Sequence, residues 1–195
     1  MSSAPDEVLL PPYVGITLAS VRLVRSERDA AEALAALAAM DVIGFDTESK
    51  PTFLKGEVST GPHLVQLATD DMAYLFQIGN AAAPAMLKTV LESRSILKVG
   101  FGLSDDLKRL SAKLGIDARN VLDLSTALRK GERNTLGAKT AVARFFGQKL
   151  QKSKKITTTN WAMPRLSEKQ ILYAADDAHV ALRIYRRWRL EVPAA

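Results

Sequence analysis

Acidic side chains occur in three short segments whose residue types and spacing could support metal-dependent chemistry. The first segment is Asp46, Thr47 and Glu48, which directly follows the apolar run at residues 42–45. Because residues two apart in a strand point to the same face, Asp46 and Glu48 would converge at the end of a buried strand. Ligands often bind at that edge of an open α/β sheet. The alternative is a strand that simply ends in a polar turn.

The other two segments place acids on predicted helices. Asp105 and Asp106 would lie in the first turn of a helix, where the helix dipole alone can explain acidic residues. Tyr173 and Asp177 are four residues apart and would share one face of the last helix, where they could equally be an ordinary surface pair. Taken together, the acids could surround two metal ions, an arrangement that performs in-line displacement at phosphorus.

The composition narrows the choice of metal. The chain has 195 residues, no cysteine and two histidines, which excludes disulfides, iron–sulfur clusters, thiolate zinc sites and a three-histidine zinc site. Oxygen ligands remain, and they favour Mg²⁺ or Mn²⁺. The formal net charge of +6 suits a polyanionic partner, although such a charge is common among proteins.

The elements that must position these residues follow from the hydrophobic pattern. Strands are predicted at residues 17–24, 42–47, 64–68, 73–78, 96–101 and 121–123. Helices are predicted at residues 26–40, 80–93, 104–114, 126–129, 135–146 and 167–190, with capping boxes at Ser26 and Ser167. A basic loop is expected at residues 147–165. This order predicts an α/β fold with one central sheet flanked by α-helices, and the hairpin at 64–78 makes that β-sheet mixed.

The length corresponds to one domain. We expect residues 1–15 to be an N-terminal lead-in and residues 16–192 to be a single domain, with no accessory C-terminal helical module. No apolar stretch approaches the roughly 18–20 residues of a membrane helix, and no signal peptide is visible. These features predict a cytoplasmic protein without a membrane partner.

The order of the motifs resembles the DEDD superfamily of 3′–5′ exonucleases. The matching segments are FDTE at 45–48, GLSDDLKRL at 102–110 and LSEKQILYAADDA at 166–178, with a family-like stretch at 152–170. Within the superfamily, the chain is similar to the tyrosine (DEDDy) branch of ribonuclease D and Werner-type exonuclease domains. Tyr173 and Asp177 match its Y-x-x-x-D pattern, whereas the histidine branch would need a histidine at Leu172.

The resemblance implies a ribonuclease H-like fold and a two-metal-ion mechanism. The residues that it assigns to two Mg²⁺ or Mn²⁺ ions are Asp46, Glu48, Asp106 and Asp177. Asp105 is the neighbouring alternative to Asp106. Tyr173 would complete the catalytic set by orienting the attacking water. The metal ions would activate that water and stabilise the departing 3′ oxygen, and the product would be a nucleoside 5′-monophosphate.

A basic segment before the last helix could bind the substrate. Its candidate residues are Lys152, Lys154, Lys155 and Arg165. Such a patch can follow a phosphate backbone, although a solvated loop would have the same composition. The resemblance also implies a wedge between terminal bases, for which Phe53 or Leu54 is a candidate. Trp161 is expected to pack under the loop, and Gln66 to line the cleft.

The expected partner is therefore nucleic acid, either RNA or single-stranded DNA with a free 3′ end. Two alternatives remain open from the sequence. One is a non-catalytic nucleic-acid-binding module on the same fold, which the basic segment would serve. The other is a phosphodiesterase specific for oligonucleotides.

Overall fold

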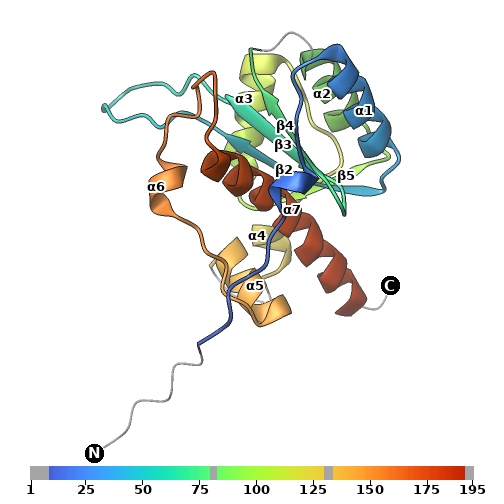
Figure 1. The fold of residues 1–195 in the computed structure, drawn as a ribbon, viewed down its shortest axis with the longest axis vertical. Coiled ribbons are helices and arrows are strands. Elements are labelled where there is room, and N and C mark those ends of the chain that lie inside the picture. The colour runs from blue at the N-terminus through green and yellow to red at the C-terminus, as the bar shows by residue number, and fades with distance from the viewer. Residues whose placement is uncertain (1–8, 80–82, 130–133, 192–195) are drawn as a thin grey trace, which may run out of the picture.

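The structure is a computed structural model, which describes residues 9–79, 83–129 and 134–191 (Figure 1). Its centre is a six-stranded sheet in the order β1-β4-β3-β2-β5-β6. The strands are β1 (Val21–Leu23), β2 (Val42–Glu48), β3 (Leu64–Ala68), β4 (Ala73–Gln77), β5 (Leu97–Gly100) and β6 (Val121–Asp123). Strand β3 runs antiparallel to both of its neighbours, and the remaining pairs are parallel. The predicted mixed sheet is confirmed.

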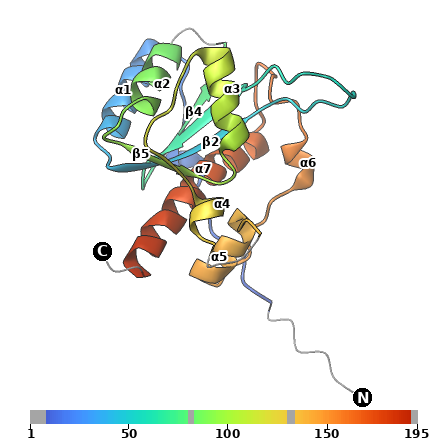
Figure 2. The ribbon, with the colours of Figure 1, turned by 180° about the vertical axis from the view of Figure 1, so that it is seen from behind.

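Helices cover both faces of this sheet (Figures 1 and 2). One face packs against α1 (Glu27–Ala38), α2 (Ala83–Leu91) and α3 (Ser104–Leu114). The other face packs against the long helix α7 (Glu168–Glu191), which contacts β2, β3, β4 and β5. The shorter elements are η1 (Leu18–Ser20), α4 (Leu124–Ala127), α5 (Ala138–Phe146) and α6 (Lys154–Thr157). Helix α5 packs beside α7.

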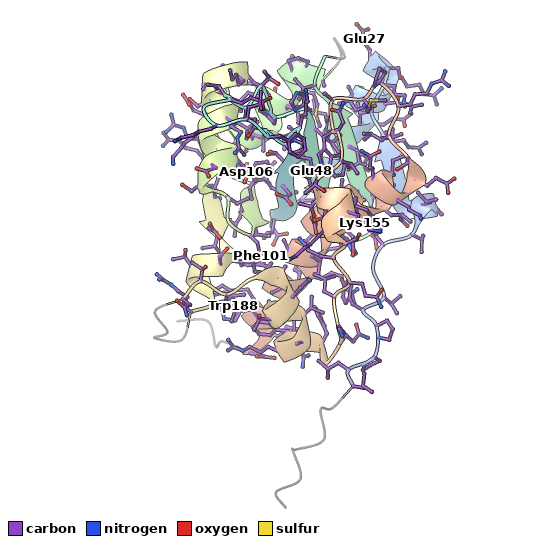
Figure 3. All side chains as sticks on the ribbon, turned by 90° about the vertical axis from the view of Figure 1, so that its left-hand side faces the viewer. Glu27, Glu48, Phe101, Asp106, Lys155 and Trp188 are labelled. Atoms are coloured by element: carbon purple, nitrogen blue, oxygen red, sulfur yellow. The ribbon has the colours of Figure 1, made fainter. Side chains whose placement is uncertain are left out.

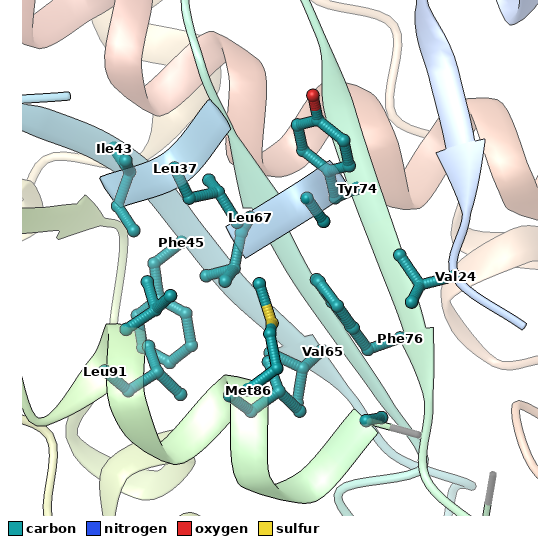
Figure 4. Close-up of a cluster of buried hydrophobic side chains, with 14 of the residues drawn as sticks. Val24, Leu37, Ile43, Phe45, Val65, Leu67, Tyr74, Phe76, Met86 and Leu91 are labelled. Carbon is teal, nitrogen blue, oxygen red and sulfur yellow. The ribbon is translucent and has the colours of Figure 1, made fainter. Parts of the chain in front are cut away.

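The alternation of side chains along β2 decides where its acids point. Phe45 joins the core under α1, α2 and α3, where Figure 4 shows it near Leu67 and Leu91. The residues on either side of Phe45 must therefore face α7. Gly44 makes the close approach of that helix possible, because a Cβ there would lie 1.9 Å from the carbonyl oxygen of Ala178. The same alternation directs Asp46 and Glu48 toward α7.

The predicted helix starts at Ser26 and Ser167 are confirmed. Ser26 and Asp29 form a reciprocal capping box at α1. Before α7, the Ser167 hydroxyl accepts a hydrogen bond from the Gln170 backbone N–H (3.3 Å), and the Gln170 side chain accepts one from the Ser167 N–H (3.0 Å). In both places, partners three residues apart decide where the helix begins, so the local sequence is sufficient.

Several details differ from the prediction, and one predicted helix start cannot be compared. The segment at 17–24 opens with the 3₁₀ turn η1 before β1 begins. The basic segment at 147–165 is not entirely a loop, because α6 forms a single helical turn within it, too short to show a helical period. The start predicted at residues 80–82 lies outside the described residues, and α2 is described from Ala83 onward.

Residues 11–16 run along the body of the domain. The Tyr13 N–H donates to the Lys149 carbonyl (3.0 Å), and the Ile16 N–H donates to Asp176 Oδ1 (3.3 Å). Arg183 of α7 donates to the Tyr13 hydroxyl (2.9 Å). These contacts connect the start of the described chain to its last helix. In the described part of the chain, no helix has the length and apolar character to cross a membrane.

Candidate active site

The acids of β2 meet the acid of α7 at the end of the strand. Asp46 and Glu48 point toward α7, which carries Asp177 with only 7% of its side chain exposed. Asp106 enters from α3, and Figure 3 shows it beside Glu48 in the region between α3 and α6. The structure thus brings together four carboxylates from three segments that are widely separated in the sequence.

Buried negative charge dominates the electrostatics of this cluster. Burial raises the pKa of Asp46 well above its usual range, and the charges of Asp177 and Asp106 raise it further. Burial, together with the charges of Asp46 and Asp177, raises the pKa of Glu48 to about 9. Nearby cations and hydrogen-bond donors stabilise such carboxylates in their charged form. The cluster is therefore short of positive charge, as expected for a cation-binding site.

The two neighbouring aspartates of α3 have different surroundings. The Thr47 hydroxyl donates a hydrogen bond to Asp106 Oδ1, and the Asp106 side chain is 13% exposed. Asp105 is 70% exposed and pairs with Lys108 at 3.2 Å. Burial raises the pKa of Asp106. Of the two residues, Asp106 lies in the carboxylate cluster and Asp105 lies at the surface.

Asp123, at the end of β6, holds the turn that leads into α3. Its carboxylate accepts hydrogen bonds from the backbone N–H groups of Gly102 and Leu103, both at 3.0 Å. Gly102 has a φ of +68°, which glycine adopts without strain. The turn fixes the start of α3 and, through it, the position of Asp106. The sequence interpretation missed this residue, although an acid following a short apolar run before a helix is a typical capping signal.

Tyr173 lies one helical turn before Asp177 on α7. Its hydroxyl is 2.9 Å from Thr157 Oγ1, so α6 fixes the position of the phenol. Burial, together with the Asp177 charge, raises the pKa of Tyr173 to about 12. The phenol is therefore neutral near pH 7, which suits a hydrogen-bonding role and argues against a role as general base.

The basic residues of the 147–165 segment divide into two groups. Lys154, Lys155 and Arg165 are exposed, as a substrate-facing surface requires. Lys152 instead reaches into the carboxylate cluster, where its Nζ lies 2.6 Å from Asp177 Oδ1. The expected grouping of four equivalent basic side chains is thus replaced by three at the surface and one at the acids.

The remaining predicted residues lie around this cluster. Phe53 is 78% exposed on the loop between β2 and β3, which projects from the same side of the molecule as α6 (Figures 1 and 2). Trp161 is buried and packs 6.1 Å from the Tyr173 ring, which confirms the expected packing role. Gln66 is fully buried rather than lining a cleft, because α7 covers β3 at that point. It pairs with Asp46 across β2 and β3, and both of its amide atoms lack a hydrogen-bond partner among the described residues.

The donor set of the cluster fits divalent cations that prefer oxygen. The donors are carboxylate oxygens, which are typical ligands of Mg²⁺ and Mn²⁺, and the uncompensated buried charge favours binding of a cation. Within the described residues, no three acidic or histidine side chains converge closely enough to form a ready-made metal site. Three of the four carboxylates already have protein partners. Lys152 contacts Asp177 and the Thr47 hydroxyl contacts Asp106. The Thr47 backbone N–H donates to Asp46 Oδ1 (2.9 Å).

Comparison with known proteins identifies the family. Residues 21–193 match the family model described as 3′–5′ exonuclease. The chain belongs to the DEDD family of 3′–5′ exonucleases. It is 31% identical over 150 residues to the bifunctional 3′-5′ exonuclease/ATP-dependent helicase WRN of Mus musculus, a match that covers 75% of this chain and 11% of the mouse protein. It is 29% identical over 150 residues to a 3′-5′ exonuclease of Arabidopsis thaliana, which covers 74% and 51% of the two chains. The exonuclease chain thus spans about half or less of these relatives.

Solved structures support the same exonuclease fold. The Aedes aegypti Nibbler EXO domain superposes with a TM-score of 0.77 at 27% identity, covering 91% of each chain. Escherichia coli RNase D superposes with a TM-score of 0.75 at 24% identity, covering 88% of this chain and 44% of that one. At this identity the likeness to RNase D concerns the fold. The expected ribonuclease H-like architecture and the resemblance to the DEDD superfamily are confirmed.

Proposed function

We propose that the protein is a metal-dependent 3′–5′ exonuclease of the DEDDy type that hydrolyses RNA or single-stranded DNA to nucleoside 5′-monophosphates. The observation that carries the proposal is the gathering of four mostly buried carboxylates at the end of β2. Burial raises the pKa of all four, and neighbouring acids of the cluster raise the pKa of Asp46 and Glu48 further. The proposed metal ligands are Asp46, Glu48, Asp106 and Asp177. The match of residues 21–193 to the 3′–5′ exonuclease family supports the proposal, because hydrolysis of a phosphodiester is a reaction that such a metal-binding cluster can perform.

The chain's own residues have distinct roles in the proposed reaction. When bound, two Mg²⁺ or Mn²⁺ ions supply a water of lowered pKa and stabilise the negative charge on the leaving 3′ oxygen. The four carboxylates would hold these ions at the end of β2. Tyr173 positions the attacking water through its neutral hydroxyl, which Thr157 orients. Asp123 keeps Asp106 in place through the turn at residues 102–103.

The surface beside the cluster suits a single strand of nucleic acid. Lys154, Lys155 and Arg165 are exposed on the segment between α5 and α7 and would follow the phosphate backbone. Phe53 is exposed and can stack on a terminal base, an interaction that tolerates any sequence. A Trypanosoma brucei RNase D of the same fold has been solved in complex with RNA U12, which supports RNA as one substrate class.

The proposal is tested by release of nucleotides from 3′-labelled single strands of RNA and of DNA, with and without Mg²⁺ or Mn²⁺. Wild-type protein should release 5′-monophosphates only when metal is present. Asp106→Ala should lower the rate at least about a hundredfold. Substitution of a residue that only supports a metal ligand already lowers metal affinity or activity by roughly 10- to 100-fold. Asp105→Ala is the matched control, because it removes a neighbouring acid that lies at the surface, and it should retain most of the activity.

Three outcomes would contradict the proposal. Equal rates for wild type and Asp106→Ala would show that the cluster does not catalyse. Binding of single strands without metal-dependent release would favour a non-catalytic nucleic-acid-binding module. Release from the shortest members of a length series alone would favour a phosphodiesterase specific for oligonucleotides.

A further inference from the structure

A positive charge of the protein lies inside the carboxylate cluster. Lys152 Nζ is 2.6 Å from Asp177 Oδ1, and it lies 5.7 Å from the centroid of the Tyr173 ring. The side chains of Lys152 and Asp177 are 28% and 7% exposed, so the pair is largely removed from water. This ion pair places an ammonium charge inside the cluster.

The backbone before Lys152 is held in place and aims the side chain at Asp177. The Lys149 N–H donates to the Pro11 carbonyl (2.8 Å), and the Lys149 carbonyl accepts from the Tyr13 N–H (3.0 Å). Leu150 is buried. Lys154, only two residues further on, is exposed on α6. The position of Lys152 at the acids is thus specific to this residue and not shared by the whole basic segment.

We propose that Lys152 is the counter-cation of the metal-free site, which releases Asp177 when a divalent ion binds there. This inference rests on the proposed metal site. An ammonium and a divalent cation on the same carboxylate would repel each other strongly in a poorly solvated environment. Lys152 has a flexible four-carbon stem and partial exposure, which allow it to leave. The protein then holds the buried acids together without metal, and metal binding frees a cation beside the site for a substrate phosphate.

Removal of Lys152 should change metal affinity and stability in opposite directions. The lysine competes with the metal for Asp177, so its removal should strengthen metal binding. It also neutralises buried charge, so its removal should weaken the metal-free fold. A lysine that served only as a substrate contact would affect neither quantity.

The test uses Mn²⁺ binding, measured by calorimetry or by the electron paramagnetic resonance of free Mn²⁺, and thermal unfolding without metal. Lys152→Met should bind Mn²⁺ at least about tenfold more tightly than wild type, because a close positive charge is removed, and should unfold at a lower temperature without metal. Lys152→Gln should show the same tightening if Lys152→Met does not fold. Lys154→Met is the matched control, since it removes an equal charge from the surface and should change the affinity less than about threefold.

The outcomes separate this inference from the function on which it rests. Unchanged or weaker Mn²⁺ binding by both Lys152 variants, with wild type binding and Asp46→Ala not binding, would overturn the role of Lys152 and leave the metal site intact. If Lys154→Met strengthened Mn²⁺ binding as much as the Lys152 variants, the role of Lys152 would also be overturned, because the effect would then come from net charge. Failure of wild type and both Lys152 variants to bind Mn²⁺ would overturn the metal site and the inference together.

Discussion

Substitution of Gly44 by alanine would test whether the close packing of α7 on β2 sets the geometry of the site. A Cβ at this position would lie 1.9 Å from the carbonyl oxygen of Ala178 and 2.8 Å from its carbonyl carbon. Both are backbone atoms, so no side-chain rotation can relieve the clash. Ala178 directly follows Asp177, and the helix would have to move at the residue next to the proposed metal ligand.

The size of this movement follows from the same distances. Real Cβ atoms essentially never approach another heavy atom closer than 3.0 Å, so the carbonyl oxygen of Ala178 must retreat by at least 1.1 Å. A displacement of about 1 Å in a catalytic group can cost roughly a hundredfold in rate. Overpacking of this kind also destabilises a protein by about 1–3 kcal/mol. Gly44→Ala should therefore lose both activity and stability.

The assay compares Gly44→Ala with Gly137→Ala by metal-dependent nucleotide release and by urea unfolding. Gly137 is a suitable control because its φ is −82° and a Cβ there would have no neighbour within 4 Å. Glycine is preferred over alanine at an N-cap, so we expect the control to lose about 1 kcal/mol of stability. It should keep near full activity, because no atom lies where its Cβ would be. If Gly44→Ala matched the control in both measurements, the packing of α7 on β2 would not determine the site geometry.

Three further predictions address residues that support the site and the fold. Lys98 is fully buried and its pKa is lowered from 10.5 to about 8 by burial. The unfolded chain still holds the proton that the folded chain releases in this range. The free energy of unfolding of wild type should therefore rise by about 2 kcal/mol relative to that of Lys98→Met between roughly pH 7 and pH 9.5. An equal difference between the two proteins at both pH values, measured by urea unfolding, would contradict this. Asp123→Ala should lose about 1–2 kcal/mol of stability and also nucleotide release, whereas Asp123→Asn should restore part of both; equal release by all three proteins would show that the turn does not position Asp106. Gln66→Leu should stabilise the metal-free protein by about 1–3 kcal/mol, because it removes a buried amide without a partner, and a lower unfolding temperature would refute this.

The elements could be predicted where local chemistry decides them. Residues 42–45 read as a buried strand because they are uniformly apolar, and helices on both faces of the sheet account for that. Ser26 and Ser167 predicted helix starts because their partners lie three residues away. The single turn α6 could not be predicted, since four residues are too few to show a period.

The site could be predicted only as far as the family pattern extends. Spacing alone left Asp105 and Asp106 as alternatives, and their surroundings differ because successive helical residues point about 100° apart. Asp106 meets Thr47, whereas Asp105 faces solvent. The pairing of Lys152 with Asp177 was missed because 25 positions separate the two residues and the path of the chain between them depends on tertiary packing.

Helix α7 covers one face of the sheet, yet it is synthesised after every strand. At roughly 5–20 residues per second, the ribosome adds the 114 residues between Gln77 and Glu191 in about 6–23 s. During that time the apolar side chains of β3 and β4 that face α7 have no cover from it, so a nascent chain is exposed to association through this face. For the same interval Asp177 is absent from the end of β2. The proposed nuclease site is therefore incomplete until the last helix has docked.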